Sequence, residues 1–320
     1  MERQDMRFEG RVALVTGAGR GLGQQYAKLL AERGARVVVN DVGCQVNGAG
    51  RSPHSAGDTV EAIVKAGGSA IASADDISRR EGARAAVTAA LREWGRLDVI
   101  VNNAGIFIPQ SFSDLTDDAW SRTLDTHIGG TFQVVRAGWE HMRDAGNGRI
   151  VNTCSATVYG LPGTAAYGAA KGAVLGLTKT LAIEGAEHGI KVNAVMPFAA
   201  TRITDQTVPE GEFRSMFDRM FPAEKVACVV AWLAHEDVPC TGEIFETGGG
   251  YVRRVLLTVT TGQAWDRPTP ENLRSAYTTI ADPSHTWAPK DSNDALRSIT
   301  QHLQDQAADI PDWIDTAPAP

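Results

Sequence analysis

The sequence predicts an α/β protein with a single doubly wound, mainly parallel sheet and a helical extension at its C-terminal end. Three observations favour this class. Short apolar runs rich in valine and isoleucine alternate with segments whose apolar residues recur at helical spacing. The chain contains 33 glycines, which suit many tight turns between strands and helices. Its length of 320 residues is compatible with one α/β unit.

The first predicted elements are a strand at 11–15, a helix at 24–32 and a second strand at 36–40. A glycine-rich turn, Thr16–Gly23, joins the first strand to the helix. Glycines in this context let backbone N–H groups approach a pyrophosphate at a helix N-terminus. The spacing of these glycines differs from the commoner GxGxxG, but the physical reason for them is the same. The turn therefore indicates a dinucleotide site.

Asp41 follows the second strand, where a carboxylate can accept both hydrogen bonds of an adenosine ribose and repel a 2′-phosphate. This predicts NAD rather than NADP. Arg20, inside the glycine turn, is the one feature that favours a phosphorylated cofactor. Each residue also has a plainer interpretation, Asp41 as an ordinary turn residue and Arg20 as a solvated surface charge.

The alternation continues along the chain, with strands predicted at 97–101, 148–153, 190–195 and 244–246 and crossover helices that include 82–93 and 118–143. Such a pattern gives a mainly parallel sheet and gathers active residues at the carboxyl ends of its strands. We expect a cofactor-binding domain over residues 1–250 and a partly helical extension over 251–320. In the extension, Thr269-Pro270-Glu271 is a typical helix start, and 291–306 can form a further helix.

Tyr167 and Lys171 are four residues apart, so their side chains lie on one face of a predicted helix. A nearby ammonium favours the phenolate and lowers a tyrosine pKa that is normally about 10. The pair can then act as a general acid and base near neutral pH. Alone, this spacing is also compatible with an incidental Tyr and Lys on a surface helix.

Four motifs make the chain resemble the short-chain dehydrogenase/reductase family over residues 8 to about 250: the glycine turn, Asn102–Gly105, Tyr167-x-x-x-Lys171 and Pro197. The resemblance implies a Rossmann sheet and an enzyme that oxidises a secondary alcohol with NAD. Four cysteines and seven histidines show no metal-ligand spacing, so we expect no metal. The cofactor-binding residues implied by the resemblance are Gly17, Arg20, Gly21, Leu22, Gly23, Asp41, Asp76, Ile77, Asn103, Ala104, Gly105, Tyr167, Lys171 and Pro197.

The resemblance also implies a serine that holds the substrate oxygen, 13 residues before the tyrosine, but that position is Cys154. Ser155 is 12 residues before Tyr167, and a one-residue deletion in the intervening loop makes it the predicted catalytic serine. Thr157 is the alternative. Cys154 is interpreted as a small buried hydrophobic residue at a strand end.

His127 stands where the family usually has an asparagine of the proton relay. One interpretation is that His127 only packs and satisfies a backbone group. The other is that it, or its carbonyl, positions a water beside Lys171, since histidine both donates and accepts hydrogen bonds.

Within the family, the chain is similar to the (3R)-hydroxyacyl-CoA dehydrogenase segments of peroxisomal multifunctional enzymes of type 2, also described as 17β-hydroxysteroid dehydrogenases. Stretches such as Val38–Gly43, His127–Val134 and Ala137–Met142 carry this similarity. It implies a (3R)-hydroxyacyl-CoA substrate, with a 17β-hydroxysteroid as the alternative. A nucleotide sensor or structural protein without catalysis is the alternative from a different class.

The net charge of −7 disfavours nucleic acid and anionic membranes as partners. Arg202, Arg253 and Arg254 are candidates for a basic patch that an acyl-CoA would need, or else ordinary solvated surface residues. Residues 203–222 are interpreted as a substrate lid, or as a loop whose aromatic residues pack on the core.

The chain has no apolar signal core or membrane-length apolar run, which predicts a cytoplasmic protein without membrane insertion. We expect a homodimer or homotetramer in which the extension packs on the core or a neighbouring subunit.

Overall fold

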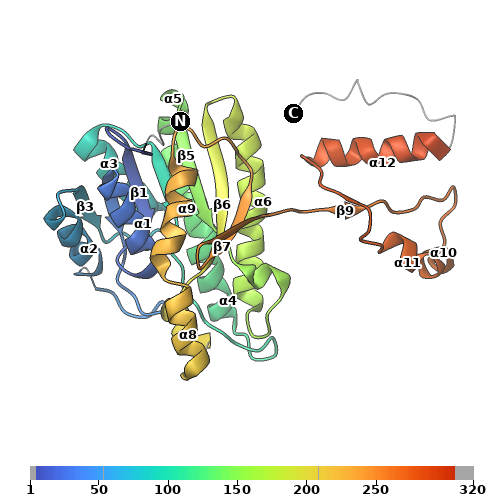
Figure 1. The fold of residues 1–320 in the computed structure, drawn as a ribbon, viewed down its shortest axis with the longest axis horizontal. Coiled ribbons are helices and arrows are strands. Elements are labelled where there is room, and N and C mark those ends of the chain that lie inside the picture. Colours follow the sequence, from blue (N-terminus) through green and yellow to red (C-terminus); the bar gives the residue numbers. More distant parts are fainter. Residues whose placement is uncertain (1–4, 53, 208, 307–320) are drawn as a thin grey trace. The chain divides into compact units, whose positions relative to one another are not determined.

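The computed structural model describes residues 5–52, 54–207 and 209–306. The chain divides into two compact units, Met1–Arg254 and Val255–Pro320. The first unit contains an eight-stranded sheet in the order β3-β2-β1-β4-β5-β6-β7-β8 (Figure 1). Neighbouring strands from β3 to β7 pair in parallel. The predicted α/β class with a doubly wound sheet is confirmed.

Strands and helices alternate along most of the first unit. The strands are β1 (Val12–Thr16), β2 (Arg36–Asn40), β3 (Ser69–Ser73), β4 (Val99–Asn102), β5 (Gly148–Thr153), β6 (Ile190–Phe198), β7 (Ile244–Gly248) and β8 (Tyr251–Val255, which ends one residue into the second unit). The helices are α1 (Gly21–Glu32), α2 (His54–Lys65), α3 (Arg80–Trp94), α4 (Asp117–Leu124), the π-helical turn η1 (Asp125–Gly129), α5 (Gly130–Asp144), the 3₁₀ turn η2 (Ala156–Tyr159), α6 (Ala165–Ala186), α7 (Arg202–Thr207), α8 (Glu212–Met220) and α9 (Ala223–Ala234).

Helices cover both faces of the sheet, because its central strands are apolar on both sides. On one face α1 and α9 pack side by side, and Tyr26 of α1, Val230 of α9 and Val37 of β2 belong to one buried apolar cluster (Figure 1). On the other face α3, α5 and α6 cover residues such as Ile100 and Val192. The sheet thus has a buried apolar cluster on each face. The carboxyl ends of its parallel strands lie along one edge, and the predicted site residues are at that edge.

The structure differs from the predicted elements in three places. The helix predicted at 118–143 is interrupted by the π-helical turn η1, and residues 203–222 contain the two short helices α7 and α8. The sheet also continues beyond β7. Gly249 and Gly250 have φ values of 64° and 92°, which permits a two-residue turn into the edge strand β8.

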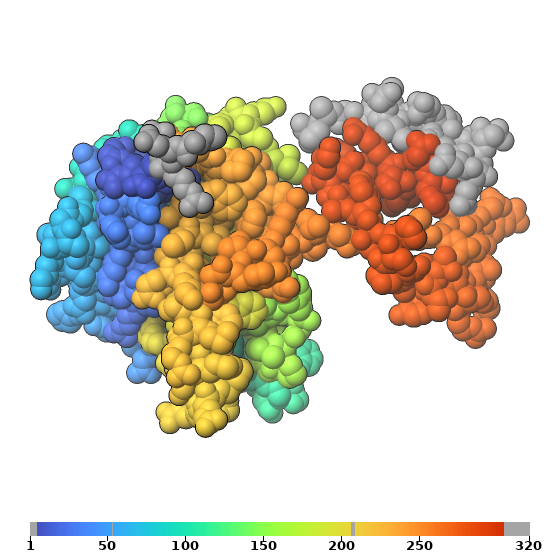
Figure 2. Space-filling view, viewed as in Figure 1, coloured from blue at the N-terminus to red at the C-terminus, as the bar shows by residue number. Residues whose placement is uncertain are grey.

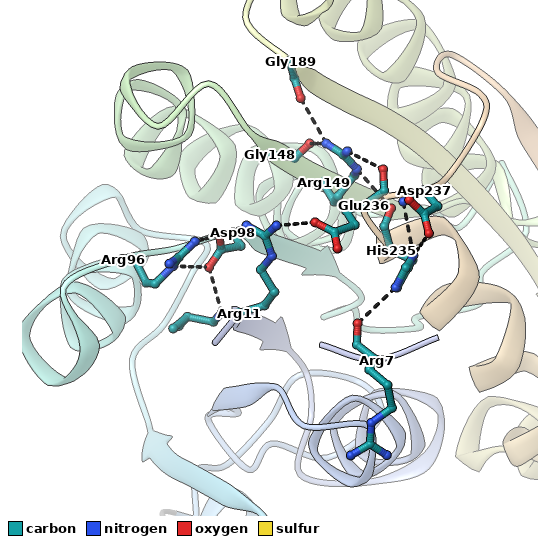
Figure 3. A network of polar contacts seen from close by, with 11 residues as sticks. Arg7, Arg11, Arg96, Asp98, Gly148, Arg149, Gly189, His235, Glu236 and Asp237 are labelled. Atoms are coloured by element: carbon teal, nitrogen blue, oxygen red, sulfur yellow. Dashed lines mark hydrogen bonds and ion pairs between the residues drawn. The ribbon is translucent and has the colours of Figure 1, made fainter. Parts of the chain in front are cut away.

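A polar network fastens the amino ends of the strands, on the edge opposite the predicted site (Figure 3). Asp98 accepts from Arg96, from Arg11 and from the backbone N of Val12. The buried Arg149 guanidinium donates to the carbonyls of four residues: Gly148, Gly189, His235 and Glu236. These bonds hold the starts of β1, β4 and β5 and the end of α9 together.

The second unit contains a short antiparallel pair, β9 (Val259–Thr260) and β10 (Thr286–Trp287), and the helices α10 (Pro270–Ser275), α11 (Tyr277–Ile280) and α12 (Ser292–Gln306). Helix α10 begins at the predicted cap, where the Thr269 hydroxyl accepts from Asn272 N at 3.2 Å. Leu296, Ile299 and Leu303 of α12 are exposed at helical spacing. Residues 307–320 of the predicted extension lie outside the described residues. None of the helices in the described part of the chain has the length and apolarity of a membrane span.

Candidate active site

The glycine turn is packed directly on the segment that follows β4. Gly17 has φ 61°, and a Cβ atom there would lie 2.7 Å from the Cα of Ala104. The side-chain amide of Asn103 donates to Thr16 O at 3.0 Å and to Gly17 O at 3.1 Å. A side chain at Gly23 would collide with the Gly17 carbonyl. Glycine is therefore required here by close backbone approach, and the predicted residues Gly17, Gly23, Asn103 and Ala104 lie together.

Thr16 is a residue of this site whose role the sequence did not reveal. Its hydroxyl accepts from the backbone N of Asn103 at 3.0 Å and of Ala104 at 3.1 Å. It thereby ties the carboxyl end of β1 to that of β4. The position of Thr16 at the end of the strand, directly before Gly17, is the feature of the sequence that could have indicated this role.

Asp41 lies against the glycine turn. One carboxylate oxygen accepts from Gly19 N at 2.9 Å and the other from Gly43 N at 2.6 Å. Gly19 has no room for a side chain, because Ser55 and Asp41 fill the space beside it. This crowded cradle of N–H groups beside a carboxylate fits the ribose end of a dinucleotide. Arg20 directly precedes α1 and is exposed.

Asp76 and Ile77 follow β3 at the same edge of the sheet. Asp76 accepts from Ser78 Oγ at 2.7 Å and pairs with Arg51 at 2.6 Å. Burial alone would raise the pKa of Asp76, but the hydrogen bonds from Ser78 and Arg51 outweigh it and lower that pKa. Ile77 is buried and fills the space beside Gly130, the first residue of α5.

Tyr167 and Lys171 lie on the first turns of α6, as the spacing predicts. The Lys171 ammonium donates to Thr153 O at 2.6 Å and lies 5.6 Å from the centre of the Tyr167 ring. Burial raises the pKa of Tyr167 to about 12, although a hydrogen bond with Ser155 opposes the change. The predicted lowering of the tyrosine pKa by Lys171 is not found: burial raises this pKa, and the opposing effect comes from Ser155.

Lys171 is itself strongly affected by its surroundings. Its side chain is buried, and burial lowers its pKa to about 8. The Cys154 thiol, in contrast, has a raised pKa, mainly because of burial. The thiol therefore remains protonated near neutral pH, and Lys171 is the cation of this site.

Ser155, rather than Cys154, is placed next to Tyr167. The Cys154 thiol points into α6 and lies 3.2 Å from Lys171 O, as a buried residue at the end of β5. Ser155 caps η2, where its hydroxyl accepts from Thr157 N at 3.2 Å and hydrogen-bonds Tyr167. The Thr157 hydroxyl is buried without a partner among the described residues. The geometry favours Ser155 as the oxygen-binding serine, which stays a prediction.

His127 is buried in the π-helical turn η1. Its Nε2 lies 2.8 Å from Ile106 O and 3.2 Å from Ile106 N, so the tautomer decides which bond forms. Burial, and then the nearby Lys171 charge, lower the pKa of His127 to about 3, and the ring is neutral. The ring packs edge-on against Tyr167 at 5.0 Å and occupies the space beside Gly105. These contacts match the packing interpretation, while the role in a proton relay stays untested.

The predicted basic patch is wrong for two of its three arginines. Arg253 pairs with the buried Glu246, and Arg254 donates to Glu243 at 2.5 and 2.7 Å. Arg202 donates to Cys44 O. Because Glu246 and Glu243 neutralise the charges of Arg253 and Arg254, these two arginines do not form a free binding site for an anion.

A cavity of about 500 Å³ lies beside the end of β6, one residue after Pro197. Phe198, Met220 and Phe221 form its apolar wall, and Arg219 and Lys225 also line it. Within the described residues these two cations have no carboxylate partner, and Lys225 donates only to Gly249 O. Neither cation was predicted from the sequence. Helices α8 and α9, which carry them, form a yellow-to-orange ridge on the visible face (Figure 2).

The aromatic residues of the predicted lid stack on one another. Phe217 stacks on Phe221 with ring centres 4.7 Å apart, and Phe213 lies 6.4 Å from Phe217. Met220 is half exposed. The helical form of the segment is compatible both with a substrate lid and with a segment whose aromatic residues pack on the core.

Comparison with known proteins identifies the family. The short chain dehydrogenase profile matches residues 11–212, which is more than half of the chain. The chain belongs to the short chain dehydrogenase family. It is accordingly an oxidoreductase that works with a nicotinamide cofactor.

Among its relatives, this dehydrogenase is 41% identical to mouse peroxisomal multifunctional enzyme type 2 over 303 residues. The alignment covers 93% of the chain but 40% of the mouse protein. The structure of full-length peroxisomal multifunctional enzyme type 2 from Drosophila melanogaster is similar with a TM-score of 0.79 and 29% identity, covering 95% of this chain and 51% of that one. A 7α-hydroxysteroid dehydrogenase complexed with NADH gives a TM-score of 0.69 and 25% identity, covering 77% and 95%.

Proposed function

We propose that the chain oxidises a (3R)-hydroxyacyl-CoA to the 3-ketoacyl-CoA with NAD. The similarity to peroxisomal multifunctional enzyme type 2 over 93% of the chain carries this proposal. The grouping of Ser155, Tyr167 and Lys171 around one point supports it, because removal of a hydroxyl proton needs a base beside a group that holds the oxygen.

In this mechanism Ser155 donates a hydrogen bond to the substrate oxygen and holds the carbinol carbon in place. Tyr167 takes the hydroxyl proton. The Lys171 ammonium, 5.6 Å from the tyrosine ring, favours the phenolate electrostatically. A nicotinamide cofactor held at the glycine turn would supply the acceptor for the hydride of the carbinol carbon. Buried His127 and Phe107, both edge-on to Tyr167, exclude water from the phenol.

NAD is favoured over NADP by the position of Asp41. Its carboxylate lies at the glycine turn, where two backbone N–H groups orient it. A 2′-phosphate at this place would meet that negative charge. Arg20 is exposed beside the same turn and is a cation that would favour the phosphate.

A 17β-hydroxysteroid, or another hydrophobic alcohol, is the second candidate substrate. The similarity to a hydroxysteroid dehydrogenase structure and the apolar wall of Phe198, Met220 and Phe221 favour it. A role as an NAD-binding sensor without turnover is the alternative outside the enzymes, and the intact pair of Tyr167 and Lys171 argues against it.

Assembly and location are further proposals. The exposed apolar residues of α12 suit packing against a neighbouring subunit in a homodimer or homotetramer. A cytoplasmic location stays the sequence-based prediction, and the multifunctional relatives are named as peroxisomal enzymes.

The test is NADH formation with (3R)- and (3S)-hydroxyacyl-CoAs of medium and long chain length, and with a 17β-hydroxysteroid. Turnover of the (3R) thioesters alone, lost in Tyr167→Phe, is the expected result. Turnover of the steroid alone would replace the substrate and keep the mechanism. NAD binding without turnover of any substrate, unchanged by Tyr167→Phe, would favour the sensor.

A further inference from the structure

The segment between β2 and α2 is a closed loop, which we call the 42–52 loop. Its two ends meet where Ser52 N donates to Val42 O at 3.0 Å. Gly43 has φ 70° and no room for a side chain, because Ser52 lies against it. A loop with joined ends and tight internal packing holds a defined shape, so a shift at one end of it moves the residues that are bonded to its tip.

The tip of this loop is fastened to the catalytic side of the molecule. Val46 O accepts from Phe107 N at 2.8 Å, and Asn47 O accepts from Arg122 Nη2 at 2.9 Å. Gly48 lies next to these two contacts, with φ 83°. The loop thus spans from the end of β2 to the segment after β4 and to helix α4.

The residues that the tip holds form one wall of Tyr167. Phe107 is buried, and its ring lies edge-on to Tyr167 at 5.3 Å. Its neighbour Ile106 bonds to His127, whose ring also packs edge-on against Tyr167. The base of the loop begins next to Asp41, the proposed ribose acceptor. One short loop therefore joins the ribose end of the cofactor site to the surroundings of the catalytic phenol.

We propose that the 42–52 loop positions Tyr167 for proton removal, with Val46, Asn47 and Arg122 as positioning residues that act through Phe107. This rests on the proposed function of Tyr167. The rate of a proton transfer depends steeply on the placement of the reacting groups, so a displaced wall lowers kcat more than it changes binding.

Two glycines of the loop provide a matched pair of variants. Gly48 and Gly50 both have positive φ, at 83° and 74°, so alanine strains the backbone at both. A Cβ at Gly48 would lie 3.0 Å from Arg122 Nη2 and 3.1 Å from Ile106 Cγ2, whereas a Cβ at Gly50 meets nothing within 4 Å. Gly48→Ala presses the tip against the ends of the Arg122 and Ile106 side chains, and Gly50→Ala controls for strain.

We expect Gly48→Ala to lower kcat about tenfold with a change of less than about twofold in the KM for NAD. Gly50→Ala should stay within about twofold in both constants. Displacement of Phe107 also lets water reach the phenol, so the ionisation of Tyr167 should move to lower pH in Gly48→Ala. An ultraviolet titration of each variant, with its Tyr167→Phe counterpart subtracted, measures that ionisation without any turnover.

A second pair removes the tip contact from outside the loop. Arg122→Ala breaks the bond to Asn47 and the ion pair with Asp118, whereas Asp118→Asn removes the ion pair alone. We expect Arg122→Ala to follow Gly48→Ala, and Asp118→Asn to match the unaltered chain. This pair also decides the matter if Gly48→Ala does not fold.

Equal kcat and equal Tyr167 ionisation in the two glycine variants would overturn the proposal, as would equal losses in both. If the unaltered chain oxidises no alcohol in the panel, the proposed function fails. The ultraviolet titration still decides the positioning role in that case, because it needs no substrate.

Discussion

Replacing Lys171 by methionine should stabilise the fold near neutral pH. Burial lowers the pKa of Lys171 from 10.5 to about 8, so holding the buried charge costs about 3 kcal/mol, at about 1.4 kcal/mol for each factor of ten. Methionine has a similar length and no charge. The variant loses the charged hydrogen bond to Thr153 O, worth about 1.5–3 kcal/mol. We therefore expect a net gain of up to about 1.5 kcal/mol in the free energy of unfolding.

The same pKa predicts how this difference depends on pH. Because the folded pKa lies below the unfolded value, the unfolded chain binds more protons between about pH 8 and 10.5. The unaltered chain therefore gains stability as the pH rises through this window, and Lys171→Met loses that gain. The stability advantage of the variant should disappear at the upper end of the window. There the lysine is neutral in both states, and only the cost of the missing hydrogen bond to Thr153 O distinguishes the variant.

The assay is urea unfolding followed by tryptophan fluorescence, at pH values below, within and above this window. Lys179→Met, in the same helix α6, controls for a lost lysine, since Lys179 is only partly buried. Turnover should fall about a hundredfold or more in Lys171→Met and remain in Lys179→Met. A Lys171→Met variant that is less stable than the unaltered chain near neutral pH, with the same pH dependence, would refute the reasoning.

Four further predictions concern the cofactor turn, the lid and the extension. Asp41→Ala should raise the KM for NAD about tenfold and change the KM for NADP much less, as steady-state kinetics with both cofactors will show. Asn103→Asp should lower the free energy of unfolding by about 2–3 kcal/mol, because an acceptor then faces the two carbonyls that its amide now satisfies. Phe217→Ala combined with Met220→Ala should raise the KM of long substrates far more than that of short ones, and an equal loss at all chain lengths would contradict the lid. Deletion of 256–320 should reduce the oligomer size in light scattering, and unchanged size and activity would contradict docking of the extension.

Local patterns predicted much of the sheet and the glycine turn. The strand 148–153 was predicted with the bounds that the structure gives, and all six residues are buried although only Ile150 and Val151 are aliphatic. The glycines of the turn were found because close backbone approach allows no other residue, as at Gly17 and Gly23. The Tyr167 and Lys171 pair was found because helical spacing alone puts both on one face.

Properties that depend on distant contacts were missed. The pKa of Tyr167 is set by burial among segments far apart in the sequence, so the neighbouring lysine alone gave the wrong direction. Arg253 and Arg254 were interpreted from the sequence as unpaired charges. Their pairing with Glu246 and Glu243 depends on the turn between β7 and β8, which the sequence analysis did not predict. The π-helical turn around His127 leaves no mark in the apolar periodicity, which continues through it.

The edge strand β8 determines whether the sheet can pair with strands of other molecules. It is the last strand of this sheet in the described part of the chain, and its side chains are mostly exposed, so no further strand of the sheet pairs with its outer side there. Open edges invite pairing between molecules and aggregation, and charged side chains at an edge oppose it. Arg253 and Arg254 place two cations on this edge while their glutamate partners hold them to the neighbouring part of the same chain. The hairpin therefore protects the largely buried strand β7 from pairing with a strand of another molecule.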